Sequence, residues 1–335
     1  MKNSDLLLSI IIISYNTQDL TLQTLDSIVK EIKNSKLLKN KTEIIAIDNH
    51  STDKSPEFIK KFLRNSKCKY LFIANKKNLG FAKANNQGIK QSKAKFILLL
   101  NSDTIVQKSA LENLIETFQK YPIRDKTAAL ISHQGVLDKL GILSATLLNS
   151  DSSIQKHGGS TPTLFSLFNH MLMLDKLPLI GRYLPSTQYS GRSKKGQVQE
   201  LEKIRPIQQG WVCAAAVLVK KEVFNDIGLL DENFFMYGED IEFCLRAKKH
   251  HWDIAIDPTS LISHLGSASS SSANALKGEF TAYQYIWAKH KADWQMPFLK
   301  SLLIIGAVLR IIIFDKIVKN RKKLQIYKEI IKKIS

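Results

Sequence analysis

The first half of the chain alternates continuous apolar runs with segments that carry apolar residues at helical spacing. The first run extends from Leu6 to Ser14 and contains four consecutive isoleucines. A strand that is apolar on both faces is typical of a parallel sheet covered by helices on both sides. Four such repeats are predicted, with strands at 6–14, 43–48, 70–74 and 95–100 and helices at 18–32, 55–63, 81–91 and 109–121. The sequence therefore predicts an α/β fold with a mostly parallel central sheet.

Beyond residue 128 the pattern loosens and then returns. The stretch 161–189 mixes apolar and basic residues with three prolines and a glycine, and the polar segment 190–203 is predicted to be a loop. Regular elements resume as strands at 210–219 and 252–257, helices at 220–227, 241–250 and 273–291, and a Ser-rich loop at 263–272. We expect one domain over 1–270, made of the halves 1–125 and 126–270, and a helical extension at 271–335.

The chain carries a large positive charge. Its 335 residues include 49 Lys and Arg against 30 Asp and Glu, which gives a formal net charge of +19. Such a charge suits nucleic acid, an anionic membrane surface or phosphorylated small molecules. Nucleic acid is not expected, because the aromatic residues are not interleaved with Lys and Arg in any recognisable binding module.

The last 63 residues hold +9 of this charge, with 13 Lys and Arg against 4 Asp and Glu. They also contain an apolar stretch, 301–314, that only Arg310 interrupts. The stretch is shorter than the ~20 residues that a helix needs to cross a bilayer. A basic segment beside an apolar one is typical of peripheral contact with an anionic membrane. The alternative is a core or dimer helix surrounded by solvated lysines.

The cysteines and the N-terminus indicate a compartment. Cys68, Cys213 and Cys244 are too few and too scattered for a disulfide scaffold or a cysteine-based zinc site, which fits a reducing environment. The N-terminal apolar run lacks a small-residue cleavage site and is followed directly by polar residues. It is predicted to be a buried strand rather than a signal peptide.

Polar residues follow three of the predicted strands. They are Ser14-Tyr15-Asn16, Asp48-Asn49 and Asn101-Ser102-Asp103. Because ligands of such sheets bind beyond the carboxyl ends of the strands, we expect a site where these clusters meet. Asp48 can accept the imide N–H of a uracil or thymine ring, and Asn49 can hold a ribose or a base edge. The alternative is a turn and an N-cap for the helix that follows.

Asp103 is a candidate ligand for a divalent metal ion. Mg²⁺ and Mn²⁺ take oxygen ligands and share them with a diphosphate, and a carboxylate at a strand's end faces the ligand edge. Asn, Ser and Asp are also common in turns and N-caps, so a surface turn is the alternative.

A second acidic group, Glu239-Asp240, follows the aromatic run 234–237. A carboxylate beside aromatic side chains that exclude water can become basic enough to take a proton from a hydroxyl. Acidic residues are also ordinary at a helix N-terminus. His264 stands alone in its predicted loop, where a histidine is more often solvated or capping than a ligand.

Taken in order, seven elements resemble glycosyltransferase family 2, the nucleotide-sugar-dependent inverting enzymes of the GT-A fold. They run from Leu8 to about Gly266 and are Ile10-Ile11-Ile12-Ile13-Ser14-Tyr15-Asn16, Asp48-Asn49-His50-Ser51-Thr52-Asp53, Asn78-Leu79-Gly80-Phe81-Ala82-Lys83-Ala84-Asn85-Asn86, Leu98-Leu99-Leu100-Asn101-Ser102-Asp103, Gly210-Trp211-Val212, Phe234-Phe235-Met236-Tyr237-Gly238-Glu239-Asp240 and His264. The third and the sixth are most similar to the bacterial rhamnosyltransferase-like branch. The resemblance implies a nucleotide-binding half at 1–125, an acceptor and catalytic half at 126–270, and a membrane-proximal extension.

The resemblance also implies roles for individual residues. Asp240 would be the general base, with Glu239 supporting it. Asp103 and His264 would hold Mg²⁺ or Mn²⁺, although Asn101 replaces the first carboxylate of the family's metal motif. The implied donor-binding residues are Ser14, Tyr15, Asn16, Asp48, Asn49, Gly80, Asn85, Asn101, Ser102, Asp103 and Trp211. For Trp211 the alternative is an ordinary core residue.

The implied function is transfer of a sugar from a dTDP- or UDP-linked donor to a hydroxyl of a glycan or a polyprenyl-diphosphate-linked acceptor. Rhamnose is the sugar implied by the branch, and cell-surface polysaccharide the product. Such an enzyme would be cytoplasmic, peripheral on the inner face of the plasma membrane, and compatible with a homodimer. A catalytically silent nucleotide-sugar-binding or scaffold protein of the same fold is the alternative. A processive synthase is not expected, because such synthases carry several membrane-spanning helices.

Overall fold

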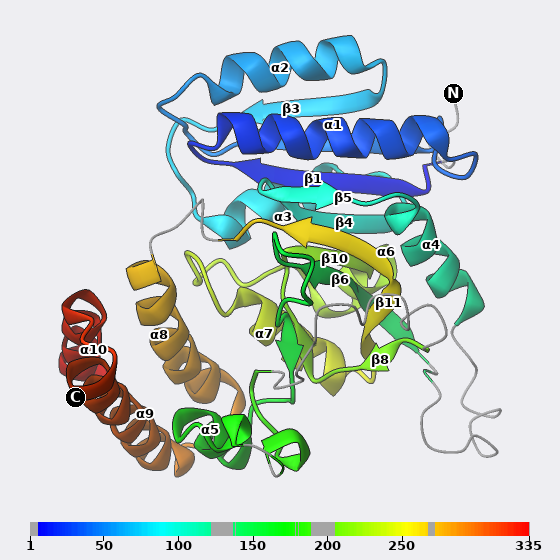
Figure 1. The fold of residues 1–335 in the computed structure, drawn as a ribbon. Helices are drawn as coiled ribbons and strands as arrows, with labels where there is room; N and C mark the ends of the chain where they lie inside the picture. The colour runs from blue at the N-terminus through cyan, green and yellow to red at the C-terminus, as the bar shows by residue number, and fades with distance from the viewer. Residues whose placement is uncertain are drawn as a thin grey trace, which may run out of the picture.

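The computed structural model describes residues 6–121, 137–188 apart from 138, 178 and 180, 205–266, and 272–334. Its central strands are β1 (Leu8–Ser14), β2 (Thr42–Asp48), β3 (Lys69–Ala74), β4 (Phe96–Asn101), β5 (Thr104–Val106), β6 (Leu140–Leu148), β8 (Ile207–Gln208), β10 (Ala216–Lys220) and β11 (Asp253–His264). They form one sheet in the order β3-β2-β1-β4-β10-β6-β11-β5, with β8 paired to β11 (Figure 1). Strands β7 (Gly158–Gly159) and β9 (Trp211–Val212) form a separate pair.

The pairings confirm the predicted fold class. Strands β1, β2, β3 and β4 run parallel to one another, β10 runs against β4 and β6, and β11 is parallel to β6. Only β5, β8 and β10 therefore point against the other six strands. The sheet is mixed but mostly parallel.

Helices cover both faces of the sheet. The helices of the described residues are α1 (Gln18–Asn34), α2 (Ser55–Ser66), α3 (Phe81–Gln91), α4 (Ala110–Lys120), α5 (Leu164–Met171), α6 (Lys221–Ile227), α7 (Glu239–Lys249), α8 (Ser272–His290), α9 (Gln295–Ile312) and α10 (Arg321–Ile334), with short segments η2 (Leu174–Lys176), η3 (Gly181–Tyr183) and η5 (Ile313–Ile317). Alternate residues of β1 enter opposite cores: Ile10 and Ile12 pack with α1, α2 and α4, and Ile11 with α3, α6 and α7. This explains why the strand is apolar at every position.

The second half departs from the prediction in three places. The central strand β6 was not predicted, although Leu140–Leu148 is apolar and fully buried between β10 and β11. The predicted strand 210–219 is wrong as one strand, because the chain turns at Ala214, whose N–H donates to the Asp240 carboxylate, so that β9 and β10 join different sheets. The predicted loop at 263–272 begins later, since β11 continues through His264. The predicted loop 190–203 lies outside the described residues.

The C-terminal helices lie beside the sheet rather than within its layers (Figure 1). Helix α9 contacts α5, α8 and α10, and its buried residues share a core cluster with the sheet strands. The apolar stretch 301–314 was predicted to be too short to span a membrane, and this prediction was wrong because the helix that contains it is longer than the stretch. The continuous helix Gln295–Ile317 has 23 residues and a mean hydropathy of 2.1, which is enough by length and composition, and 28% of its most apolar part is buried within the protein.

Candidate functional site

The three polar strand ends meet as predicted. Because β1, β2 and β4 are parallel and in register, Ser14 lies opposite Asp48, and Ile13 opposite Asn101. A cleft of about 480 Å³ opens at this edge and is bordered by the turn before α7, by His264 and by α8. Ten predicted site residues line it: Tyr15, Asn49, Gly80, Asn101, Ser102, Asp103, Trp211, Glu239, Asp240 and His264.

Four other predicted donor-binding residues do not line the cleft, and each makes a structural contact. Ser14 Oγ lies 3.0 Å from Thr21 Oγ1, and Asn16 Oδ1 accepts from the Thr52 N–H at 2.7 Å. Asp48 accepts from the Ser51 N–H at 3.0 Å, and Asn85 Nδ2 donates to Phe81 O at 3.0 Å. Asp48 Oδ1 is buried and no described residue donates a hydrogen bond to it. The binding role of these four residues stays a prediction.

Asn49 fixes the loop that follows β3. Its Oδ1 accepts from the Leu79 N–H at 3.0 Å and from Asn75 Nδ2 at 3.1 Å, and its Nδ2 donates to Asn78 Oδ1 at 2.8 Å. A buried amide that uses both its donor and its acceptor defines one orientation for its neighbours. The loop therefore reaches the cleft with a fixed backbone.

Gly80 joins this loop to the aromatic run before α7. Its backbone has φ +80°, a region that other residues rarely adopt, and a Cβ there would lie 2.5 Å from Phe235 O. The same carbonyl accepts from the Phe81 N–H at 2.7 Å. Glycine is required here by both the backbone angle and the space, and the contact connects the loop after β3 to the segment that carries the two acids.

Sheet register brings His264 to Asp103. His264 pairs with Thr104 at the end of β11, and the Leu265 N–H donates to Asp103 O at 2.9 Å. His264 Nε2 lies 3.4 Å from Asp103 Oδ1, which is buried and receives no hydrogen bond from any described residue. The strand β5, which was not predicted, supplies this ladder.

The pair fits a divalent cation. His264 Nδ1 lies 2.7 Å from Gln155 Oε1, which suits the tautomer that carries its proton on Nδ1. His264 Nε2 then accepts from Asn101 Nδ2 at 3.3 Å and lies 3.4 Å from Asp103 Oδ1. An imidazole nitrogen and a carboxylate oxygen at this separation would both be able to bind one divalent cation. Within the described part of the chain, no three His, Cys, Asp or Glu side chains are arranged to hold a metal. The remaining ligands would have to come from a bound diphosphate or from water.

Glu239 and Asp240 begin α7, where the helix dipole favours negative charge. Burial raises the pKa of Glu239 well above its ordinary value, and the neighbouring Asp240 charge raises it further. Burial also raises the pKa of Asp240, but the N–H groups of Ile241 and Ala214 favour its charged form. Glu239 Oε2 receives no hydrogen bond from a described residue. The hydrogen bonds therefore favour the proton on Glu239 and the negative charge on Asp240.

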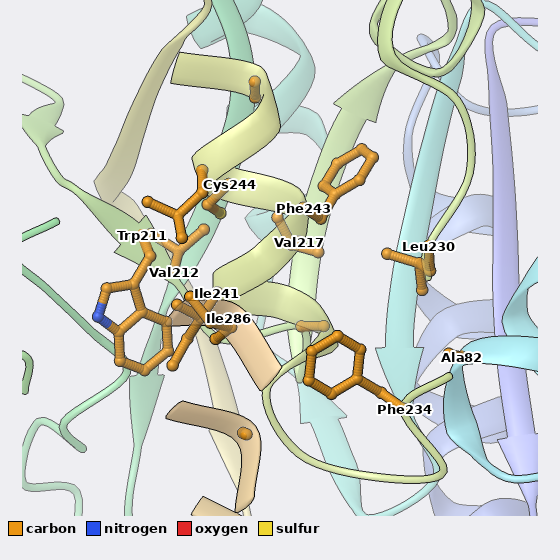
Figure 2. Close-up of a cluster of buried hydrophobic side chains, with 14 of the residues drawn as sticks. Ala82, Trp211, Val212, Val217, Leu230, Phe234, Ile241, Phe243, Cys244 and Ile286 are labelled. Atoms are coloured by element: carbon orange, nitrogen blue, oxygen red, sulfur yellow. The ribbon is translucent and has the colours of Figure 1, made fainter. Parts of the chain in front are cut away.

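Trp211 is both a core residue and a residue of the cleft wall, the two positions considered for it from the sequence. Its side chain belongs to the core cluster with Ile241 and Ile286, as Figure 2 shows, and it also lines the cleft. Its Nε1–H donates to Thr187 O at 2.6 Å. The ring is therefore fixed in orientation where it borders the cleft.

Several cleft residues were not found from the sequence. They are Lys156, His157, Gln188, Glu279 and Tyr283, together with Gln155, which orients His264. Lys156, His157 and Gln188 lie in the region whose pattern loosens, and Glu279 and Tyr283 look like ordinary residues of a helix. No local sequence signal separates them from their neighbours.

Comparison with known proteins finds relatives of the N-terminal half of the chain. Residues 9–158 match the profile described as Glycosyl transferase family 2. The poly-β-1,6-N-acetyl-D-glucosamine synthase of Staphylococcus aureus (strain MSSA476) is 30% identical over 171 residues, 48% of this chain and 39% of that protein. The Staphylococcus epidermidis synthase is 28% identical over 178 residues, 50% of this chain and 40% of that protein. The match thus spans about two fifths of the length of these relatives.

Solved structures share the fold at low identity. The S. aureus protein TarS, residues 1–349, has a TM-score of 0.51 and 15% identity and covers 94% of this chain and 74% of its own. GalNAc-T7 with UDP, GalNAc and Mn²⁺ has a TM-score of 0.60 and 14% identity, covering 90% and 51%. The mannosyltransferase PcManGT of Pyrobaculum calidifontis, with GDP-Man and Mn²⁺, gives 0.53 and 12%, covering 96% and 73%. These likenesses show the GT-A fold, and residues 9–158 of the chain are similar to glycosyl transferase family 2.

Proposed function

We propose that the protein is an inverting glycosyltransferase that moves a sugar from a nucleoside-diphosphate donor to a hydroxyl of a glycan acceptor. The carrying observation is the cleft itself, where Asp103, His264 and Asp240 converge from three separate elements. A silent scaffold of the same fold would have no need to retain all three. The relatives named as polysaccharide synthases, and the solved structures that hold UDP or GDP-Man, support a nucleotide-sugar donor.

The chemistry follows from the charges of the site. Asp240, ionised and fixed by two backbone N–H groups, takes the proton of the acceptor hydroxyl as that oxygen attacks the anomeric carbon. A single displacement from the face opposite the leaving diphosphate inverts the configuration. Glu239, holding its proton, adds no second negative charge beside Asp240. A divalent cation held by Asp103 and His264 would supply the charge that neutralises the diphosphate.

Donor binding should depend on a divalent cation and can be measured without turnover. We expect UDP or dTDP and their sugars to raise the melting temperature by several degrees with Mn²⁺ or Mg²⁺, since a ligand at 100 times its Kd adds about 2.7 kcal/mol of stability. EDTA should remove the rise. Asp103→Asn should weaken it, whereas Asp26→Asn, an exposed change on α1, should not. An equal rise in EDTA would remove Asp103 and His264 from the metal site, and no rise with any nucleotide would favour the scaffold alternative.

We further propose that the acceptor is lipid-linked and that α9 rests on an anionic membrane surface. Large apolar side chains recur on one side of this helix and are exposed; they form the α9 stripe, defined as Trp294, Phe298, Ile305, Val308 and Ile312. Leu299, Leu303 and Ala307 on the opposite side are buried in the protein. A helix packed on one side and apolar on the other is typical of interfacial attachment.

Exposed basic residues follow the stripe in the chain and favour an anionic surface. Lys316, Lys319, Lys322, Lys328 and Lys332 are exposed on η5, α10 and the segment between them. Lysines near a membrane surface add roughly 1 kcal/mol each with anionic lipid. The charge and the stripe therefore favour the inner face of the plasma membrane, where a polyprenyl-diphosphate-linked acceptor would reside. Rhamnose as the donor sugar and a homodimer remain predictions from the sequence.

Vesicle sedimentation tests this surface directly. The protein should bind vesicles of phosphatidylcholine with about one third phosphatidylglycerol at least tenfold more tightly than phosphatidylcholine alone, because the lysines contribute electrostatically. Phe298→Asn with Ile312→Asn should reduce binding at least tenfold, since burying one such side chain contributes about 1.5–3 kcal/mol. Leu71→Asn, an exposed apolar change on β3, is the matched control. Equal binding by the double variant and the control would place the membrane contact elsewhere.

A further inference from the structure

Helix α8, which the sequence assigned to a separate extension, packs closely against the turn that carries the two acids. A Cβ on Gly278 would lie 2.7 Å from Cδ2 of Tyr237, and a Cβ on Gly238 would lie 2.4 Å from Ala282 Cβ. Gly278 and Ala282 are one helical turn apart, so both contacts occur on the same side of α8. The small residues therefore let the helix approach the cleft.

One side of α8 forms a wall of the cleft. Ala275, Leu276, Glu279, Ala282 and Tyr283 all line it, at the spacing of a single helical face. Glu279 is the charged residue among them. The extension thus contributes a carboxylate to the same cleft as Asp240.

Glu279 is held by two donors on the same oxygen. His170 Nε2 lies 3.3 Å and Gln188 Nε2 3.2 Å from Glu279 Oε1. Both of these contacts are to Oε1, and the side chain is 24% exposed. A carboxylate that is anchored through one oxygen can present the other to a ligand in the cleft.

The surroundings keep this carboxylate ionised. Burial acts to raise the pKa of Glu279, but the hydrogen bond and charge of His170, with the charges of Arg310 and Lys176, outweigh it and lower the pKa. His170 lies between Glu279 and Asp175, which holds it in turn at 3.5 Å from Nδ1. These carboxylates raise the pKa of His170 against the opposing effect of its burial. The Glu279 carboxylate therefore stays ionised, held in place by neighbours of opposite charge.

We propose that Glu279 forms an acceptor subsite, in which its carboxylate accepts hydrogen bonds from hydroxyls of an uncharged sugar and disfavours an anionic group at that position. The proposal rests on the proposed glycosyltransferase function. Sugar hydroxyls are donors that a carboxylate satisfies, whereas a phosphate or uronate placed against it would meet like charge. Trp211 borders the same cleft with an apolar ring, and sugars offer an apolar face as well as hydroxyls. The donor's diphosphate belongs with Asp103 and His264, on the strand-end side of the cleft.

The test compares neutral and anionic acceptors in the full chain. With the donor chosen by the melting experiment, transfer is measured to the octyl β-glycosides of glucose, galactose and N-acetylglucosamine and to octyl β-glucuronide, and donor hydrolysis is measured without acceptor. Glu279→Gln should lower the ratio of transfer to hydrolysis for the best neutral glycoside at least tenfold, through KM. It should also reduce the preference for neutral glycosides over the glucuronide. Glu279→Asp, which keeps the charge, should retain this preference.

Controls distinguish a failure of the Glu279 subsite from a failure of the proposed glycosyltransferase function. Glu57→Gln, an exposed carboxylate on α2, should leave the ratio and the preference unchanged. A nucleotide-dependent rise in melting temperature shows that each variant is folded. Wild-type protein that neither binds nor hydrolyses a donor would contradict the glycosyltransferase function itself. Wild-type protein that hydrolyses the donor but uses no neutral glycoside, or Glu279→Gln protein with unchanged KM and preference, would overturn the subsite.

Discussion

Asp240→Asn is expected to lower the rate of sugar transfer by about 10³-fold, within the 10²–10⁴-fold range of general-base catalysis, while donor binding persists. The amide is nearly the same size as the carboxylate but cannot take a proton from the acceptor hydroxyl. Donor binding is attributed to other residues of the cleft, so the nucleotide-dependent rise in melting temperature should remain. Transfer at close to the wild-type rate would show that another group is the base.

Glu239→Gln is the matched comparison because the two acids are adjacent and line the same cleft. Burial and the charge of Asp240 raise the pKa of Glu239, so its side chain is already neutral near pH 7. Glutamine resembles that neutral form, and we expect the rate to fall by less than about tenfold, below the range for a lost general base. If Glu239→Gln proved more damaging than Asp240→Asn, the assignments of base and supporting acid would have to be exchanged.

The pH dependence of the wild-type rate adds an independent check. A carboxyl whose pKa is raised loses its charge at a higher pH than an ordinary aspartate, which titrates near about 3.9. Burial raises the pKa of Asp240. The rate should therefore fall on acidification at a pH above the ordinary aspartate range, and the small residual rate of Asp240→Asn should lack this fall.

The strand ends of the first half could be predicted because their signal is local. The apolar strands β1, β2 and β4 are continuous in the sequence, parallel strands place their carboxyl ends at one edge, and the polar residues follow directly. The pairing of Asp103 with His264 depended on resemblance alone. Its physical cause is the ladder between β5 and β11, two strands far apart in the chain, which no local pattern reveals.

The acceptor side could not be predicted for the same reason. Gln188 and His170 reach Glu279 across about a hundred residues of chain, and Glu279 reaches the cleft only because Gly278 allows close packing of α8. In the sequence, 273–291 is an ordinary helix in a basic extension. Tertiary packing, rather than residue type, makes that helix a wall of the cleft.

Gly80→Ala is expected to lower the free energy of unfolding by about 4 kcal/mol, about half from backbone strain and about half from overpacking. Gly80 has φ +80° and ψ 173°, and a Cβ would lie 2.5 Å from Phe235 O and 2.8 Å from the Phe235 ring. The carbonyl is also the acceptor for the Phe81 N–H, so it cannot move away without losing that bond. Denaturant unfolding measures the change.

Gly228→Ala isolates the backbone contribution. Gly228 has φ +80° and ψ −175°, nearly the same conformation, but its Cβ would meet nothing closer than Arg246 Nη1 at 3.8 Å. Gly228→Ala should therefore lower the free energy of unfolding by the backbone strain alone, about 2 kcal/mol.

Gly80→Ala and Gly228→Ala should also differ in activity. The Phe235 carbonyl lies four residues before Glu239, and a displacement of about 1 Å at the reacting groups can cost about 10²-fold in rate. We expect that loss in folded Gly80→Ala protein and near wild-type transfer in Gly228→Ala. Equal activity of the two would mean that the contact between the loop after β3 and the turn before α7 serves stability alone.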